Sequence, residues 1–416
     1  MKIGAVRRET RNGDESVSAK IEWEDADRVP VDLRCSFRGG DRPSGDPNVF
    51  LIATFFPALE AGERRIAVEG AICPLLRDGL RAAAAVIGAW HGANRAVPVI
   101  APSEGFHPGD PTSVAGEGIY LSGGLDSLDL LLSRGAGLPR EHPAAVRRAI
   151  FAANFTCHPE AAKVAELSAR AHRAAAAMAS ACDLPLTVIE GNLLELHADF
   201  AFFSRISHGS VLGAMAQLFS GRLIAVALAA SDDARSGLGP WGSHPLLDPL
   251  FGTSALRFVH DGIGASRAGK ARRTGPTELA RRHLFVCDNP NPGDPLPNCG
   301  RCEKCLRTMT ELLVAGALAE SETFPRDVEP ERIRELPGVP PFRSLRYYWA
   351  PLAAAAQVAG RRDLADAIRT RLDEERRARS WHAERGWKGR LRRLDRRRLG
   401  GRLLALRRGL GGDQAP

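Results

Sequence analysis

The sequence contains no run of about 18 apolar residues, although 44% of its 416 residues are hydrophobic. Its first residues, which include a lysine and two arginines, carry no apolar core of signal-peptide length. These two absences argue against a membrane-spanning helix and a secretory leader. We therefore expect a soluble, cytoplasmic protein. An aromatic platform for nucleic-acid bases is not evident either, so tRNA binding is not predicted.

Cysteine is scarce, with eight residues in the chain. Eight cysteines could form four disulfides in an oxidising compartment. Three of them, however, have the spacing C-x-x-C-x-x-C, which indicates a metal site in a reducing compartment.

The net charge of +8 is concentrated at one end of the chain. Residues 361–416, here called the basic tail, hold 18 Lys and Arg against 8 Asp and Glu, a net of +10, so the remainder is about −2. Within the tail, Trp381–Arg408 has leucines among its arginines. A basic amphipathic helix of this kind could contact nucleic acid, an anionic membrane or another anionic partner. A solvated, partly disordered helix is the alternative.

The segment Gly118–Ser127 joins a short apolar run to a helical pattern. Residues 119–121 predict a buried parallel strand, and the residues from Asp126 predict the start of a helix. Between them, the N–H groups of a Ser-Gly-Gly turn and the positive end of the helix dipole would point at one spot, which suits a phosphate. Glycine permits the close approach of the backbone. A plain strand-to-helix turn is the alternative.

The motif Ser122-Gly-Gly-Leu-Asp-Ser127 resembles the pyrophosphate-binding loop of the ATP pyrophosphatase superfamily, which includes asparagine synthetases and GMP synthetase. Those proteins split ATP between the α and β phosphates and activate a substrate as its adenylate. The resemblance implies an α/β fold of the adenine-nucleotide α-hydrolase type, a parallel sheet with helices on both faces. It also implies a nucleotide-binding loop made of Ser122, Gly123, Gly124, Leu125, Asp126 and Ser127, with Asp126 as a catalytic group.

The pattern of apolar residues divides the chain into three regions. Residues 1–110 predict an α+β accessory domain, with strand candidates at 29–35 and 65–69, an apolar run at 48–56, a helix over 71–90 and a last strand at 97–101. Residues 111–320 alternate strand and helix, with further strands at 149–154, 184–190 and 223–228, which predicts a parallel sheet. Residues 321–416 predict a helical, arginine-rich region, with helices at 346–349 and 353–379.

Ligands of parallel sheets bind at the carboxyl ends of the strands, so the residues that follow each strand are candidates for a site. By position, the resemblance assigns adenosine binding to Asn154 and Phe155 after the second strand of the α/β region, and to Glu190 and Gly191 after the third.

Acidic and imidazole groups follow the fourth strand. Asp232 and Asp233 would lie where Mg²⁺ or a substrate amine could be met. His244 and Asp248 could orient a substrate or act as acid and base. A loop rich in turn-forming residues, with a stacked tryptophan, is the alternative.

A basic segment over residues 264–271 nearly matches the Walker A pattern, but Ala271 replaces the hydroxyl residue that should bind Mg²⁺. The resemblance suggests another role, because superfamily members place a late lysine or arginine over the leaving pyrophosphate. Lys270 is the first candidate, and Arg267 is a second cation for the nucleotide. An exposed basic turn is the alternative.

Four cysteines, Cys287, Cys299, Cys302 and Cys305, predict a tetrahedral zinc site. Three come from one tight turn and Cys287 closes the site from a distance, across a loop rich in proline. A metal can hold such an irregular loop in place. An iron–sulfur cluster and a redox C-x-x-C remain as alternatives.

Two features together resemble 7-cyano-7-deazaguanine synthase over residues 118–315. They are residues 122–127, here called the phosphate loop, and the later four-cysteine segment 287–305, here called the cysteine knuckle. The N-terminal region, the basic tail and the segment 241–248 depart from that family. The resemblance implies an ATP- and Mg²⁺-dependent carbon–nitrogen ligase. It would adenylate a carboxylate, such as that of a 7-deazaguanine, and transfer the acyl group to ammonia or an amine, including an amine on a protein. No side-chain nucleophile is needed, so the absence of a Ser-His-Asp pattern is no obstacle.

Two other functions stay open. The chain could be a non-catalytic nucleotide-binding scaffold or sensor. It could also be a tRNA sulfur-transfer enzyme of the same superfamily, for which Cys157 is the one suitably placed cysteine.

Overall fold

The computed structural model describes residues 1–11, 13–38, 41–92, 95–107, 116–135, 138–155, 161–197, 199–234, 238–291, 293–338, 345–383, 391 and 394–395. They form two compact units. The first comprises residues 1–300 and 311–326, and the second comprises residues 301–310 and those from 327 onward. No helix within these ranges is both long and apolar enough to cross a bilayer.

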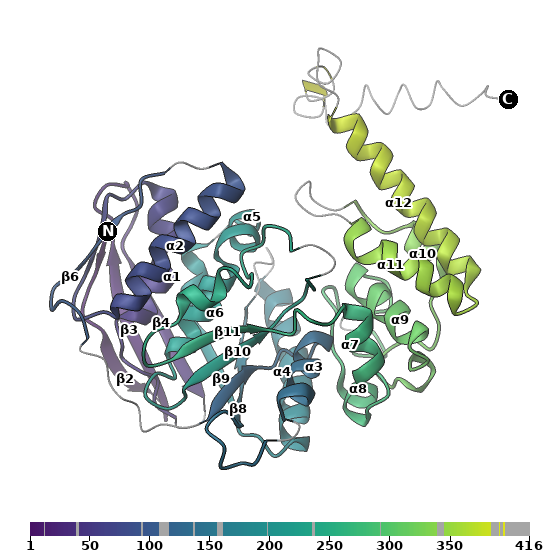
Figure 1. Cartoon of the computed structure of the whole chain (residues 1–416), viewed down its shortest axis with the longest axis horizontal. Coiled ribbons are helices and arrows are strands. Elements are labelled where there is room, and N and C mark those ends of the chain that lie inside the picture. Colours follow the sequence, from purple (N-terminus) through teal and green to yellow (C-terminus); the bar gives the residue numbers. More distant parts are fainter. Residues whose placement is uncertain are drawn as a thin grey trace. The chain divides into compact units, whose positions relative to one another are not determined.

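A mixed sheet of eleven strands forms the centre of the first unit (Figure 1). Five parallel strands lie in the order β11-β10-β7-β8-β9. They are β7 (Glu117–Tyr120), β8 (Val146–Ala152), β9 (Leu186–Gly191), β10 (Ala225–Ala229) and β11 (Arg257–Asp261). Successive strands are added on one side of β7 up to β9, and then on its other side from β10. Such a reversal opens a crevice at the carboxyl ends of β7 and β10, where ligands of open α/β sheets bind.

Helices cover both faces of these strands (Figure 1). On one side, α3 (Leu125–Gly135) packs with α7 (Arg267–Thr274), and α4 (Ala161–Ala181) packs with α8 (Glu278–His283). On the other, α1 (Asn48–Ala61) packs with α2 (Pro74–His91) and α6 (His208–Gln217). Strand side chains alternate between the two layers. Tyr120, Ile150 and Val226 belong to the core that contains α1 and α6, whereas Ile119 and Ala149 are buried outside it.

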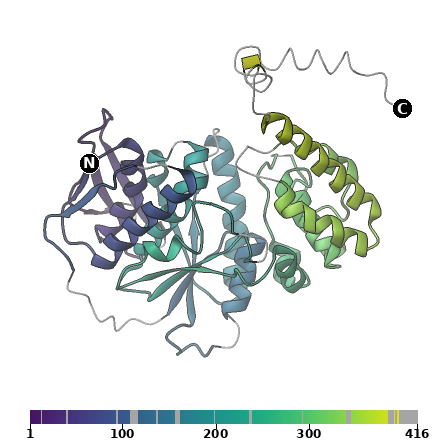
Figure 2. The ribbon, with the colours of Figure 1, turned by 45° about the horizontal axis from the view of Figure 1, so that its top comes forward.

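The N-terminal strands continue the same sheet (Figure 2). They are β1 (Lys2–Ile3), β2 (Arg7–Arg11), β3 (Asp14–Glu22), β4 (Val31–Arg38), β5 (Arg65–Val68) and β6 (Val99–Pro102). Strand β4 pairs antiparallel with β9, with Cys35 opposite Gly191. The glycine is needed for this contact, because a Cβ there would lie 2.5 Å from the Arg34 carbonyl oxygen. The sheet therefore runs across the boundary that the sequence suggests near residue 110.

The apolar run at 48–56 is the start of helix α1, and every residue from Asn48 to Ala58 is buried. A helix that is apolar on all sides is buried on all sides. Its pattern cannot be distinguished from that of a buried strand by periodicity alone.

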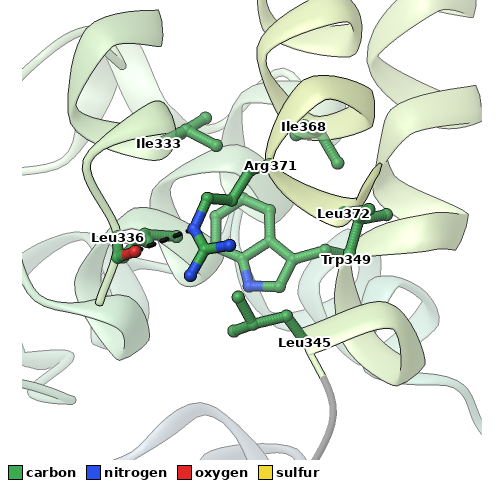
Figure 3. Close-up of a pocket in the computed structure, with 7 residues that line it drawn as sticks. All are labelled: Ile333, Leu336, Leu345, Trp349, Ile368, Arg371 and Leu372. Carbon is green, nitrogen blue, oxygen red and sulfur yellow. Dashed lines mark hydrogen bonds between the residues drawn. The ribbon is translucent and has the colours of Figure 1, made fainter. Parts of the chain in front are cut away.

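The second unit contains α10 (Pro330–Arg334), α11 (Leu345–Val358) and α12 (Arg362–Ala383). Figure 3 shows their apolar side chains gathered around Trp349, with Arg371 threaded between them. The Nε of Arg371 donates to the Leu336 carbonyl oxygen at 2.8 Å. These side chains leave no room for a ligand, so the seam is the core of this helical unit.

Candidate functional site

The loop between β7 and α3 is held by its own serines. The hydroxyl of Ser127 accepts a hydrogen bond from the backbone N–H of Ser122 (3.2 Å) and donates to the Gly124 carbonyl (3.0 Å). It also lies 3.1 Å from the Ser122 hydroxyl, and helix α3 begins at Leu125. The predicted strand, turn and helix are therefore present, and hydrogen bonds within the loop hold the turn.

The two glycines of this loop differ in their surroundings. Gly123 has a φ of +78°, and a Cβ there would lie 2.8 Å from the Cβ of Ala174. At Gly124 a Cβ would meet the Ser122 hydroxyl at 3.3 Å and then only the Phe285 carbonyl at 3.8 Å. Gly123 is thus required by the fold, whereas Gly124 leaves open the space through which a ligand would approach the backbone.

Lys270 connects the ends of the two central strands. Its Nζ lies 3.2 Å from Asp126 Oδ1, after β7, and also donates to the carbonyl of Ala230, directly after β10. The side chain is only 1% exposed. Residues 264–271, which nearly match the Walker A pattern, form a loop and the first turn of α7. The side chain of Ser266 caps this helix by accepting a hydrogen bond from the Gly269 N–H. This turn brings a buried cation to the point where the strand order reverses.

Further charged groups surround this contact. Arg267, one turn before Lys270 on α7, forms an ion pair with Asp126, and its Nε lies 3.1 Å from Glu311 Oε2. One turn after Lys270, Arg273 binds both carboxylate oxygens of Asp129 at 2.8 Å. The structure thus brings Asp126, Arg267 and Lys270 together, as the site predicted from the sequence requires.

A cavity of about 340 Å³ lies beside the loop between β7 and α3, and Arg170, Arg173, Arg282 and His283 are among its lining residues. Phe285, in its wall, donates its backbone N–H to the Gly123 carbonyl at 2.9 Å. Arg170, another lining residue, is bound to Glu166 and to the carbonyls of Asn291 and Pro297. These contacts fix α4 against the loop that carries the cysteines.

At the carboxyl end of β8, Phe155 belongs to an aromatic cluster. Its ring stacks on His208 with centroids 5.5 Å apart, and it meets Phe203 edge-on at 5.3 Å. Asn154, just before it, has a φ of 55° and donates its N–H to Ser168. The sequence did not indicate Phe203 or His208, which approach Phe155 because a π-helical turn over Phe203–Ser207 precedes α6.

The end of β9 is engaged by the N-terminal strands. Glu190 forms an ion pair with Arg38 of β4, and Gly191 pairs with Cys35 in the ladder. Strand β9 is also two strands away from β7. The structure therefore does not bring Glu190 and Gly191 to the phosphate loop, and their role toward adenosine stays a prediction from the resemblance.

After β10, Asp233 and His244 are both buried. The Nδ1 of His244 accepts from the Leu246 N–H at 3.0 Å, and its ring meets Trp90 edge-on at 4.7 Å. Burial lowers the pKa of His244, and the nearby carboxylate of Asp248 opposes this shift only in part. The imidazole is therefore held neutral, with its proton on Nε2.

Asp248 contacts a histidine that the sequence did not indicate. Its Oδ2 accepts from the Ser243 hydroxyl and lies 2.7 Å from His260 Nδ1, while Oδ1 accepts from the His244 N–H at 3.3 Å. Asp248 is fully buried. His260 was missed because strand β11, near whose end it lies, has too few apolar residues to be recognised as a strand.

The four cysteines of the knuckle come together. The Sγ atoms of Cys287, Cys299, Cys302 and Cys305 all lie within 4.8 Å of one another. A tetrahedral zinc site with bonds of about 2.3 Å needs sulfurs about 3.8 Å apart, so the cluster could hold a metal ion such as zinc. Across the described ranges, it is the one group of three or more ligating side chains.

Asn298 supports the loop that bears Cys287 and Cys299. This amide is buried and donates to the carbonyls of Leu284 (2.8 Å) and Thr323 (3.1 Å). It also accepts from the Val286 N–H at 2.9 Å. The Asn289 N–H points at Cys287 Sγ from 3.4 Å, a contact that favours a thiolate.

Two predictions fall on residues that are not described. Cys157 lies outside the described residues, and so does most of Trp381–Arg408. Comparison with family models, curated proteins and solved structures finds no match to this chain. Assignment of a function therefore rests on the geometry of the site and on the motifs it contains.

Proposed function

We propose that this protein is an ATP-dependent, AMP-forming carbon–nitrogen ligase. The observation that carries the proposal is the contact of buried Lys270 with Asp126 and the Ala230 carbonyl. It places a cation at the carboxyl ends of β7 and β10, beside a rigid Ser-Gly-Gly turn that opens a helix. A cation, backbone N–H groups and a helix N-terminus are together the groups that bind and stabilise phosphate.

The leaving pyrophosphate of ATP would bind the loop from Ser122 to Ser127. Lys270 and Arg267 would offset the charge that develops on it as the bond between the α and β phosphates breaks. Asp126 and Asp233 offer carboxylate oxygens for Mg²⁺, which is usually held by one or two carboxylates together with phosphates. In the free protein the buried Lys270 is paired with Asp126.

The acyl substrate would be a carboxylate whose oxygen attacks the α phosphate. Ammonia or an amine, including one on a protein, would then displace AMP from the acyl-adenylate. The half-buried ring of Phe155, stacked on His208 and packed edge-on against Phe203, lies at the same sheet edge. An aromatic side chain there suits stacking with a planar ring, either the adenine or a 7-deazaguanine carboxylate.

The cysteine cluster would hold a structural zinc. Four protein ligands leave no position for water or substrate, which a catalytic zinc needs. Four thiolates of this kind suit the reducing cytoplasm.

The identity of the nucleotide product tests the proposal. The full chain is incubated with ATP, Mg²⁺, 7-carboxy-7-deazaguanine and ammonium, and then with a panel of other carboxylates. We expect AMP and pyrophosphate, and no AMP from Asp126→Ala at the same concentration of folded protein. ADP and phosphate would contradict the assignment. ATP binding without turnover across the whole panel would favour the scaffold or sensor instead.

A further inference from the structure

The paired side chains of His260 and Asp248 form a dyad with a defined polarity. Because Asp248 is fully buried and its Oδ2 lies 2.7 Å from His260 Nδ1, the imidazole donates its Nδ1–H to the carboxylate. In the neutral tautomer with this hydrogen bond, the lone pair lies on Nε2. The structure gives Nε2 no hydrogen-bond partner among the described residues, and the side chain is 6% exposed. A carboxylate-backed imidazole with a free lone pair is the arrangement of a general base.

The carboxylate itself is held in place from two further directions. The Ser243 hydroxyl donates to the same oxygen as His260, and the His244 N–H donates to the other oxygen. A Cβ at Gly209 would lie 2.1 Å from Asp248 Oδ1, so α6 also closes tightly over the carboxylate. Asp248 can therefore position His260 without moving.

The imidazole of His244, beside the dyad, has the opposite hydrogen-bonding role to that of His260. His244 accepts at Nδ1 from the Leu246 N–H, so its Nε2 carries the proton and is a donor. Its pKa is lowered by burial, which keeps it neutral. Two neighbouring histidines thus present one acceptor and one donor. Environments that separate the roles of paired titratable groups are typical of sites of proton transfer.

The dyad lies at the edge of the sheet where the proposed nucleotide site lies. His260 pairs with Leu228 in the β10–β11 ladder, two residues before Ala230, whose carbonyl holds Lys270. The next residue, Asp261, binds Arg134 of α3, so alternation directs His260 to the opposite face of the sheet. The titratable groups beside His260 are Asp248, His244 and Asp232, the last of which lies two residues after Ala230 and acts on His244.

We propose that His260, backed by Asp248, accepts the proton of the attacking amine when it displaces AMP. This inference rests on the proposed ligase function and adds to it the group that completes the second half-reaction. The amine nitrogen forms a bond to the acyl carbon, the bond from that carbon to the AMP oxygen breaks, and AMP leaves with the electron pair. The N–H proton moves to His260 Nε2 and is then released to water.

The test separates the two half-reactions of the full chain. Exchange of labelled pyrophosphate into ATP in the presence of 7-carboxy-7-deazaguanine reports adenylation, and amide formation with ammonium reports acyl transfer. For His260→Gln we expect exchange within about twofold of the native rate and amide formation lowered by about 10²-fold or more. His107→Gln is the control, because His107 also lies near a carboxylate (3.8 Å from Asp46) but is 41% exposed. It should change neither rate.

Each outcome decides between the two proposals. Unchanged amide formation in His260→Gln, or an equal loss of both rates in the folded variant, would overturn the role of His260. Native protein that exchanges no pyrophosphate with any carboxylate would overturn the ligase function first.

Chemical modification tests the dyad without a substrate. Diethyl pyrocarbonate acylates imidazole nitrogens that carry a lone pair, and peptide mass spectrometry locates the adduct. We expect modification of His260 in the native protein, and at least tenfold slower modification in folded Asp248→Asn, in which the amide no longer fixes the tautomer. An unreactive His260 in the native protein would show that Nε2 is inaccessible and would overturn the inference.

Discussion

Two adjacent glycines in the phosphate loop allow the fold and the proposed chemistry to be separated by mutation. Gly123→Ala places a Cβ at a φ of +78° and 2.8 Å from Ala174, so the protein should lose at least about 1 kcal/mol of stability. Gly124→Val meets fewer atoms of the protein and should leave the melting temperature nearly unchanged. It fills the space next to the backbone N–H groups, so AMP formation should be abolished.

Thermal unfolding and AMP release, measured on both variants, check these expectations. A Gly124→Val protein that still turns over ATP would show that the phosphates do not approach this part of the loop.

Lys270 is a second residue whose role can be isolated. Methionine has a similar length and keeps the apolar stem of the lysine, while Asp126 retains Arg267 as a partner. Lys270→Met should therefore remain folded but lower the rate of AMP formation by about 10²–10³-fold, the usual cost of losing one group that stabilises transition-state charge. Lys20→Met, at an exposed lysine paired with Glu22, is the control and should leave the rate unchanged. A native rate in Lys270→Met would mean that the cation only stabilises the sheet edge.

His197 should make stability depend on pH. The imidazole is buried between the Ser207 hydroxyl and the Ala53 carbonyl, and burial lowers its pKa from 6.5 to about 4. Between these values the unfolded chain binds a proton that the folded chain does not, so stability falls as the pH is lowered from about 6.5 towards 4. The loss from this group is on the order of 3 kcal/mol over that window.

Urea unfolding of the native protein and of His197→Gln at several pH values measures this dependence. The difference in unfolding free energy between the two proteins should shrink as the pH falls. A constant difference would show that the imidazole can be protonated in the folded state.

At the scale of structural elements, the folding of the four-cysteine segment 287–305 should depend on a bound metal. We expect one zinc per chain in native protein, and we expect Cys302→Ser to lower zinc content, solubility and melting temperature, because an irregular loop has little core of its own. Activity should fall only with the folded fraction. Cys182→Ser is the matched control, since this half-buried cysteine lies outside the cluster.

Elemental analysis of protein grown without added metal decides the matter. Iron together with a visible absorption band would indicate an iron–sulfur cluster in place of zinc and would favour the sulfur-transfer alternative. Well-folded native protein without metal would rule out the metal site.

Within the α/β region, the strands that could be predicted from the sequence are those buried on both faces. Strands β7 to β10 lie within about three residues of the apolar runs that predicted them, because a strand covered by helices on both sides is apolar throughout. Strand β2 has the sequence Arg-Arg-Glu-Thr-Arg and pairs only with β3, so it has no apolar pattern to recognise. Strand β11 carries only two apolar residues and was not predicted, so His260 was not recognised as a candidate site residue.

The candidate site was predictable where its residues are neighbours in the sequence. The loop between β7 and α3 and three of the four cysteines lie in short segments, so a sequence pattern can single them out as candidates. The approach of Phe203 and His208 to Phe155, and of His260 to Asp248, depends on how separate elements pack. No local pattern encodes such contacts.

On the scale of the whole first unit, the N-terminal residues support the site and do not form a separate sheet. Strand β4 covers the edge of β9, and Trp90 of α2 packs against His244. An uncovered β9 would expose a row of unpaired N–H and carbonyl groups, which favours aggregation. The accessory role predicted for residues 1–110 therefore takes a definite form, in which they complete the sheet and wall one side of the imidazole pair.

The charge of the whole molecule resides in its last segment. Residues 384–416 contain 11 Lys and Arg and 3 Asp and Glu, a net of +8, so residues 1–383 are neutral overall. Helix α12 ends at Ala383, which makes this a natural place to truncate the chain.

Because Asp126, Lys270 and His260 all belong to the first unit, a chain ending at Ala383 should form AMP at the native rate. It should also lose the binding to anionic vesicles or heparin that the segment supplies, a binding that weakens as salt rises. Sedimentation with vesicles and the AMP assay measure the two properties on the same protein. Loss of AMP formation in a folded, truncated chain would instead show that the basic segment helps to build the active site.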